Sequence, residues 1–189
     1  MSQPGILNRV ISVLEAAGIE YMVTGSIVSS SQGQPRATHD IDLVVKLLPS
    51  AVPILLQAFP PPDYYLDELS VREAIRRGDM FNLLEVDTGD KVDFWLLTDE
   101  AYDLQRFSRR VSWDLAGVAA KVSRPEDTIL QKLRWSELSG GSQRQFNDAK
   151  AVLELQAGNL DLAYIERWSS TLGLQEIWAR LQKQARPIR

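Results

Sequence analysis

The stretch YMVTGSIVSSSQGQPRATHDIDLVV, residues 21–45, decides the fold. A short apolar run leads into Thr24-Gly25-Ser26, and after thirteen intervening residues the chain reads Asp40-Ile41-Asp42-Leu43. The β-branched run over residues 41–45 is typical of a strand that is buried on at least one side. Because residues two apart in a strand point to the same face, we expect Asp40 and Asp42 to project side by side, away from the core.

This pattern of side chains has a chemical consequence. Two carboxylates held together repel each other, and both stay ionised at low cost only if a cation lies between them. Mg2+ prefers oxygen ligands of this kind and leaves positions for water and substrate phosphates. Gly25-Ser26, directly after a strand, offers backbone N–H groups and a hydroxyl that suit a phosphate at the start of the next helix. The sequence therefore predicts a site for Mg2+ or Mn2+ and a phosphorylated ligand.

A third acid lies in a predicted hairpin. The strands 81–86 and 92–97 are joined by residues 87–90, where Gly89 supports a tight turn. Asp93 stands between Val92 and Phe94, and a charge in such an apolar strand is costly unless a metal ion or the sheet edge compensates it. The neighbouring strand carries Glu85, and alternation alone does not decide which of the two acids faces Asp40 and Asp42.

The remaining elements predict a mixed α/β chain of the α+β kind. A helix is expected over residues 6–17, and the polar stretch 29–34 (SSSQGQ) is expected to be a mobile loop. From residue 123 onward the pattern is helical, with interruptions at the glycines near positions 140, 158 and 173. We predict a small, mixed, antiparallel-rich sheet flanked by helices in a domain of residues 1–122. A C-terminal helical bundle, residues 123–189, follows it.

Composition excludes several classes of function. The 189 residues carry a net charge of -4, so the surface as a whole has no positive field for nucleic acid. The chain has no cysteine, which excludes a disulfide scaffold, a thiol nucleophile and a zinc–thiolate site. His39 is its single histidine, so a histidine cluster for a metal is excluded too. With neither a signal peptide nor a long apolar run, the expectation is a soluble, cytoplasmic protein without a membrane partner.

The three motifs together resemble the nucleotidyltransferase superfamily with the DNA-polymerase-β-like fold. That family has a Gly-Ser after its first strand, a pair of acids at i and i+2 flanked by hydrophobic residues, and a third acid in a later strand. The fuller string Arg36-x-Thr38-x-Asp40-Ile41-Asp42-Leu43 is similar to the AbiEii-type toxins and to small bacterial nucleotidyltransferases. The run Pro125-Glu126-Asp127-x-Ile129-Leu130-x-Lys132-Leu133, followed by Asp148, extends this similarity.

The resemblance implies an activity of the EC 2.7.7 type. A nucleoside monophosphate would pass from an NTP to a hydroxyl, with release of pyrophosphate. The acceptor could be the 3′ end of an RNA such as tRNA, a small molecule or a protein side chain, and the sequence does not decide between them. Asp40, Asp42 and Asp93 would hold the metal ions, and Asp93 would help to deprotonate the acceptor. The residues implied to bind the nucleotide are Gly25, Ser26, Arg36, Thr38 and Lys132, with Asp148 and His39 as further candidates. A toxin of this branch would also need a cognate antitoxin.

Other interpretations compete with this one. His39 is explained as well by a simple hydrogen bond beside a carboxylate, and Asp148 by the orientation of Lys132 or Arg144. A glycosyltransferase also uses an Asp-x-Asp pair, but it would leave Gly25-Ser26 and Asp93 without a role. A binding module for a nucleotide or a partner, with the same fold but without turnover, is the third alternative.

Overall fold

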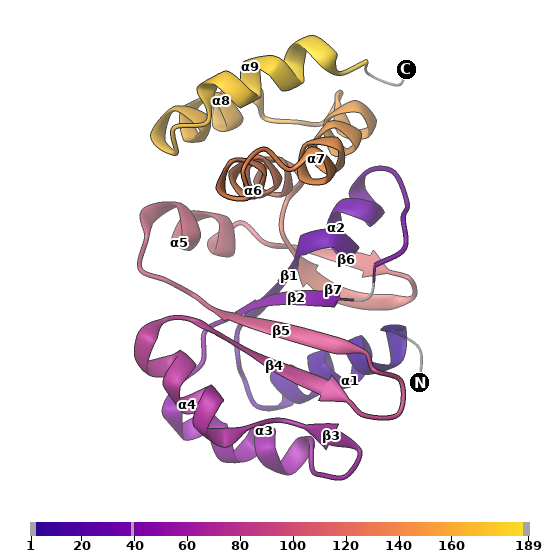
Figure 1. Cartoon of the computed structure of the whole chain (residues 1–189), viewed down its shortest axis with the longest axis vertical. Helices are drawn as coiled ribbons and strands as arrows, with labels where there is room; N and C mark the ends of the chain where they lie inside the picture. Colours follow the sequence, from indigo (N-terminus) through magenta and orange to yellow (C-terminus); the bar gives the residue numbers. More distant parts are fainter. Residues whose placement is uncertain (1–2, 39, 187–189) are drawn as a thin grey trace. The chain divides into compact units, whose positions relative to one another are not determined.

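The computed structural model describes residues 3–38 and 40–186 of the chain (Figure 1). The chain divides into two units, of which the first holds residues 1–24 and 38–122 and the second holds residues 25–37 and 123–189. Residues 25–37 thus belong with the C-terminal helices, although they lie early in the sequence. The division into domains at residue 123 stays a prediction.

The first unit is built on a mixed sheet. Its seven strands have the order β3-β4-β5-β2-β1-β7-β6 within the described residues. The pairs β2–β5 and β1–β7 are parallel, and the other neighbours are antiparallel. The bounds are β1 Tyr21–Thr24, β2 Asp40–Val45, β3 Tyr64–Tyr65, β4 Met80–Glu85, β5 Lys91–Leu96, β6 Val111–Leu115 and β7 Val118–Val122. This arrangement confirms the predicted α/β fold class with its antiparallel-rich sheet.

Helices of the first unit cover the apolar side chains of the sheet. They are α1 (Gln3–Ala16), η1 (Pro49–Ala51), α3 (Val52–Ala58), α4 (Glu68–Arg77) and α5 (Ala101–Ser108). One part of the core lies on one face of the central strands, where Ile41 and Leu43 of β2 are fully buried and Phe81 of β4 stacks on Phe94 of β5 at 4.8 Å. Alternation therefore sends residues 40 and 42 to the opposite face of the sheet.

The second unit is helical in the residues that the structure describes. Its helices are α2 (Gly25–Gln32), α6 (Pro125–Leu138), α7 (Gln143–Gln156), α8 (Leu162–Thr171) and α9 (Gln175–Gln184). The predicted helical pattern after residue 123 is confirmed. None of the described helices is long and apolar enough to cross a membrane.

The prediction of a mobile loop over residues 29–34 is wrong. Residues 29–32 end helix α2, where Ser29 and Gln32 are buried. The Gln32 side chain donates a hydrogen bond to the backbone carbonyl of Ser123 at 2.7 Å, and the backbone carbonyl of Gln32 accepts one from the side chain of Gln156 at 2.9 Å. Gly33 follows at a close approach to α7, because a Cβ atom there would lie 2.8 Å from the backbone nitrogen of Val152. Tertiary hydrogen bonds thus hold a polar segment whose local composition suggested a loop.

Candidate active site

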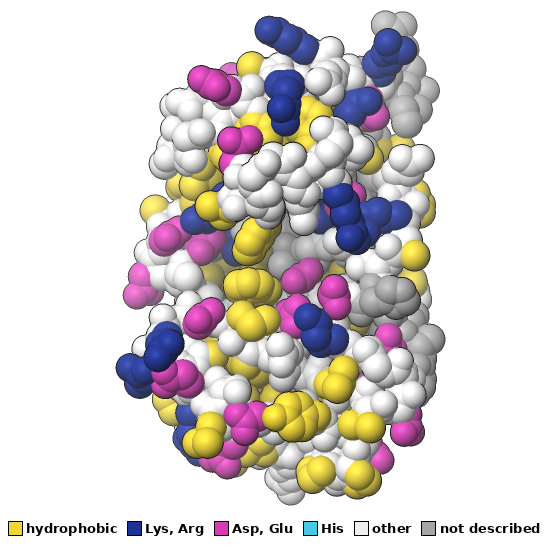
Figure 2. Space-filling model, in the orientation of Figure 1, with side chains coloured by type: hydrophobic (Ala, Val, Ile, Leu, Met, Phe, Trp, Pro, Cys, Tyr) yellow, Lys and Arg dark blue, Asp and Glu magenta, His cyan; other side chains and the backbone are white. Residues whose placement is uncertain are grey.

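The three predicted acids share one face of the sheet in the first unit. In the parallel register of β2 and β5, Asp40 is opposite Lys91 and Asp42 is opposite Asp93. Partners in register project to the same side of a sheet, and so do residues two apart in one strand. Figure 2 shows acidic side chains gathered around a basic one over these two strands. The register therefore brings together the acids that the sequence placed 51 positions apart.

The register also decides between Asp93 and Glu85. Asp93 is opposite Asn82 of β4, and Glu85 lies three residues further along that strand, so its side chain projects to the other face. There Glu85 accepts hydrogen bonds from the hydroxyl of Tyr64 at 3.3 Å and from that of Thr88 at 2.8 Å. Glu85 therefore has a structural role, and Asp93 is the acid beside Asp42.

Lys91, which the sequence interpretation missed, contacts two of the acids. Its Nζ lies 3.0 Å from Oδ2 of Asp93 and 3.8 Å from Oδ1 of Asp40. The hydrogen bond with Asp93 raises the pKa of Lys91 against the opposing effect of burial, and the charges of Asp93, Asp40 and Asp42 raise it further. The signal was present in the hairpin, because Lys91 precedes Asp93 by two residues and shares its face.

Asp42 and Asp93 differ in how their oxygens are engaged. The indole Nε1 of Trp95 donates a long hydrogen bond of 3.4 Å to Oδ1 of Asp42. Asp93 is buried, and its Oδ1 has no hydrogen-bond partner among the residues that the structure describes. A buried carboxylate oxygen without a donor is costly. It is therefore an acceptor left for a ligand.

The oxygen atoms at this site have the chemistry that a divalent cation requires. Oδ1 of Asp93, together with the neighbouring carboxylate of Asp42, supplies the hard oxygen donors that Mg2+ and Mn2+ accept. Across residues 3–38 and 40–186, no three acidic or histidine side chains converge into a ready-made metal site. The donor chemistry of these oxygens fits the cation.

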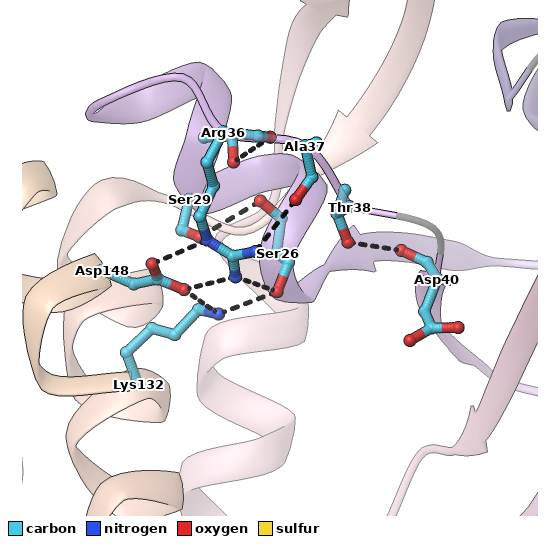
Figure 3. A network of polar contacts seen from close by, with 9 residues as sticks. Ser26, Ser29, Arg36, Ala37, Thr38, Asp40, Lys132 and Asp148 are labelled. Carbon is cyan, nitrogen blue, oxygen red and sulfur yellow. Dashed lines mark hydrogen bonds and ion pairs between the residues drawn. The ribbon is translucent and has the colours of Figure 1, made fainter. Parts of the chain in front are cut away.

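A second cluster of predicted residues lies in the second unit (Figure 3). Gly25 begins α2 with a φ of 73°, a left-handed conformation that favours glycine, and Ser26 follows in the first turn. Nη2 of Arg36 donates to Oγ of Ser26 at 2.7 Å, and Nζ of Lys132 donates to the same oxygen at 3.3 Å. Two cationic groups thus meet at a hydroxyl beside a helix N-terminus, which is a suitable environment for an anion.

Asp148 of α7 holds both cations of this cluster. It accepts two hydrogen bonds from Arg36, at 3.0 Å from Nε and 2.8 Å from Nη2, and one from Lys132 at 2.8 Å. Its side chain and that of Lys132 are 9% and 5% exposed. Burial by itself raises the pKa of Asp148, but the hydrogen bonds from Arg36 and Lys132 outweigh it and the pKa is lowered. We call Ser26, Arg36, Lys132 and Asp148 the cation cluster.

The predicted site residues thus fall into two groups. Asp40, Asp42 and Asp93 belong to the first unit, where Thr38 Oγ1 also donates to the carbonyl of Asp40 at 3.4 Å. Gly25 and the cation cluster belong to the second unit. Asp148 does orient Lys132, as one interpretation proposed, and it also binds Arg36. His39 lies outside the described residues.

Comparison with known proteins finds solved structures that are similar in fold. No family model matches the sequence, and no curated protein matches it. The antibiotic-resistance factor ANT(2'')-Ia is similar in structure, with a TM-score of 0.52 and 12% identity over 96% of this chain and 95% of that chain. An antigenic nucleotidyltransferase-like protein from Paracoccidioides brasiliensis aligns with a TM-score of 0.47 and 14% identity over 97% of this chain and 93% of its own. A CCA-adding enzyme solved with ATP gives a TM-score of 0.38 and 14% identity over 93% of this chain and 47% of that one.

Likeness at such identities is a likeness of fold. The chain shares the fold of ANT(2'')-Ia, and the membership of the nucleotidyltransferase superfamily that its motifs suggest stays a prediction. The narrower similarity to the AbiEii-type branch stays a prediction.

Proposed function

We propose that this protein is a metal-dependent nucleotidyltransferase that transfers a nucleoside monophosphate from an NTP to a hydroxyl and releases pyrophosphate. The observation that carries the proposal is the placement of Asp42 and Asp93 as partners on adjacent parallel strands, with Asp40 on the same face. A structural role accounts poorly for a buried Asp93 oxygen that has no hydrogen-bond partner among the described residues, because such an atom lowers stability.

Asp40, Asp42 and Asp93 are the residues proposed to hold Mg2+ or Mn2+. When bound, divalent ions of this kind stabilise the negative charge that develops on the attacking and leaving oxygens of a phosphoryl displacement. The acids supply only carboxylate oxygens, which is the donor chemistry that these ions prefer. The proposed ligand set is thus the face of β2 and β5 described above.

The cation cluster is proposed to bind the phosphates of the NTP. Arg36 and Lys132 bring two positive charges to Ser26, and Asp148 neutralises one of them. The remaining positive charge and the backbone N–H groups at the start of α2 attract an anion. Gly25 allows the backbone to turn into that helix, and we assign Thr38 a supporting role in the segment before Asp40.

Asp93 is proposed to take the proton of the acceptor hydroxyl. Its Oδ1, which has no donor among the described residues, is the proposed metal ligand, and Oδ2, which pairs with Lys91 in the metal-free protein, is the oxygen proposed to accept the proton. As the acceptor oxygen forms its bond to the α-phosphorus, the bond from that phosphorus to the bridging oxygen breaks. The electron pair of the broken bond leaves with pyrophosphate.

The acceptor and the biological setting follow from the resemblance to the AbiEii-type branch. We propose an RNA 3′ end, such as that of tRNA, as the acceptor. A toxin role with a cognate antitoxin, and a cytoplasmic location, belong to the same proposal. The support for these finer points is the motif string from Arg36 to Leu43 and the run from Pro125 to Asp148.

The test is transfer of label from α-32P-labelled NTPs. Purified protein is incubated with each NTP, with Mg2+ or Mn2+, and with total RNA, and the products are resolved on a denaturing gel. The matched variants are Asp42→Asn at the proposed site and Asp87→Asn in the exposed hairpin turn. We expect label in RNA with the wild type and with Asp87→Asn, and none with Asp42→Asn.

Each other result has a definite meaning. Transfer to protein or to a small molecule would keep the activity and overturn the RNA acceptor. Label transfer that survives Asp42→Asn would remove Asp42 from the chemistry. No transfer to any acceptor, together with no binding of NTP, would overturn the proposal in favour of a binding module without turnover.

A further inference from the structure

Lys91 belongs to a block of four charged residues on β2 and β5. Asp40 and Lys91 are partners in the parallel register, and Asp42 and Asp93 are the next partners on the same face. The ammonium group contacts Asp93 at 3.0 Å and Asp40 at 3.8 Å. Among the described residues, the ammonium of Lys91 therefore lies between carboxylates that the proposed function assigns to a divalent cation.

The charge balance of this block is incomplete. Within the described residues, the one ammonium of Lys91 contacts both Asp40 and Asp93, and a single positive charge does not offset the two formal negative charges. Oδ1 of the buried Asp93 is left without a hydrogen-bond partner among the described residues. A divalent ion would offset more of the charge and would also engage that oxygen, because carboxylate oxygens are its preferred ligands.

The side chain of Lys91 is suited to leave this position. It is 38% exposed, so solvent reaches it, whereas the side chain of Asp93 is 11% exposed. A lysine carries its charge as a compact, strongly hydrated group on a flexible four-carbon stem, so the charge can move into water without a change of backbone. The acids lie on two paired strands, so the sheet and not the ammonium sets their backbone positions.

We propose that the ammonium of Lys91 takes the place of a divalent cation in the metal-free protein, and that it competes with the metal ion for Asp40, Asp42 and Asp93. This inference rests on the proposed function, because it takes those acids as the metal ligands. Lys91 is then a positioning residue. It keeps the carboxylates together when no metal is bound, and it lowers the apparent affinity for the metal.

The test is a titration with Mn2+, followed by electron paramagnetic resonance of the free ion, without NTP. It compares the wild type with Lys91→Met and with Lys46→Met, a matched control whose exposed lysine pairs with Glu20. We expect Lys91→Met to bind Mn2+ about tenfold more tightly, since a competing unit charge at close range is removed from a partly solvent-screened site. Lys46→Met should bind as the wild type does.

Thermal unfolding in EDTA is the second readout. Without metal, Lys91→Met should melt below the wild type, because three carboxylates then lack their cation, and Mn2+ should raise its melting temperature more than that of the wild type. Adding Asp93→Asn to Lys91→Met should recover part of the loss in EDTA, since one of the repelling charges is gone. If Lys91→Met does not fold, Lys91→Gln replaces it in both measurements, because glutamine keeps a donor without the charge.

The outcomes separate this inference from the proposed function. Equal or weaker Mn2+ binding by Lys91→Met, with the wild type binding, would overturn the competition and leave the proposed function standing. Absence of Mn2+ binding in both proteins would overturn this inference together with the metal ligands of the proposed function. Tighter binding by Lys91→Met in a protein that transfers no nucleotide would support the inference and overturn the activity alone.

Discussion

Asp42 of β2 and Asp93 of β5 are direct partners in a parallel strand pair, although 51 positions separate them in the sequence. Parallel strands need a long crossover, and here the chain passes through α3, β3, α4 and β4 between them. The two carboxylates therefore meet only in the folded sheet. Their repulsion reduces stability unless a cation offsets it.

Asp42→Asn is expected to reduce nucleotide transfer by about a hundredfold or more, as expected when a group that stabilises the transition state is removed. Asparagine keeps an oxygen for the indole of Trp95, so the packing is preserved. Because one of the repelling charges is removed, the melting temperature in EDTA should be equal to that of the wild type or higher. Calorimetry and the transfer assay check the two expectations, and a clear fall in melting temperature would mean that Asp42 is structural.

The local sequence pattern predicted that Asp40 and Asp42 share one face of a strand and that Asp93 lies in a hairpin, because strand alternation is a local property. Asp40-x-Asp42 and the hairpin around Asp93 were visible in the sequence, as were the helices after residue 123. The choice between Asp93 and Glu85 was not visible, because it depends on how β4 and β5 pair with β2 and β3. Register is set by packing across the sheet, which no single strand contains.

The contacts of α2 and of the cation cluster also could not be predicted from local sequence patterns. The second half of helix α2, residues 29–32, looked like a loop because serine and glutamine favour turns when taken alone. Its stability comes from partners more than ninety positions away, such as the carbonyl of Ser123 that receives the side chain of Gln32. Arg36 and Asp148 are 112 positions apart and form a bidentate pair, which no local sequence pattern predicts.

Asp148→Asn is expected to lower the free energy of unfolding by about 3 kcal/mol, because it leaves the buried Lys132 without its carboxylate. Chemical denaturation at neutral pH measures this change. The matched control is Glu68→Gln, which breaks the exposed pair with Arg72 and should change stability by less than about 0.5 kcal/mol. Equal losses of unfolding free energy in the two variants would show that the buried ion pairs of Asp148 stabilise the protein no more than an exposed pair does.

The stabilisation by Asp148 should also depend on pH. Hydrogen bonds from Arg36 and Lys132 lower its pKa in the folded protein below the ordinary value of 3.8, despite the raising effect of burial. A lowered acid pKa gives stability that is present above the unfolded value and is lost as the pH falls through the folded value. The difference in unfolding free energy between wild type and Asp148→Asn should therefore be constant from pH 7 to about pH 5 and shrink below pH 4. If this difference in unfolding free energy grew on acidification, Asp148 would not stabilise the fold through ion pairs with Arg36 and Lys132.

Gly33→Ala is expected to destabilise the second unit by about 1–3 kcal/mol, as overpacking of a close contact does. The added Cβ would lie 2.8 Å from the backbone nitrogen of Val152 and 2.9 Å from the carbonyl carbon of Ala151, and backbone atoms do not yield easily. Gly158→Ala is the control, since no atom lies within 4 Å of its Cβ position and its φ is outside the left-handed region. Thermal unfolding of both variants checks the contrast, which would be absent if α2 did not pack on α7.

Ser26→Ala is expected to weaken NTP binding by about fivefold to tenfold, the loss that one hydrogen bond to a ligand produces. Arg36 and Lys132 keep their bonds to Asp148 in this variant, so the fold should lose less than about 1 kcal/mol. Ser30→Ala is the matched control, because that hydroxyl donates only a long bond of 3.4 Å to the carbonyl of Arg36. Calorimetric titration with each NTP gives the affinities, and thermal unfolding reports the stability. NTP affinity that is unchanged in Ser26→Ala would remove this hydroxyl from the phosphate site, whereas equal losses in both serine variants would indicate a general disturbance of α2.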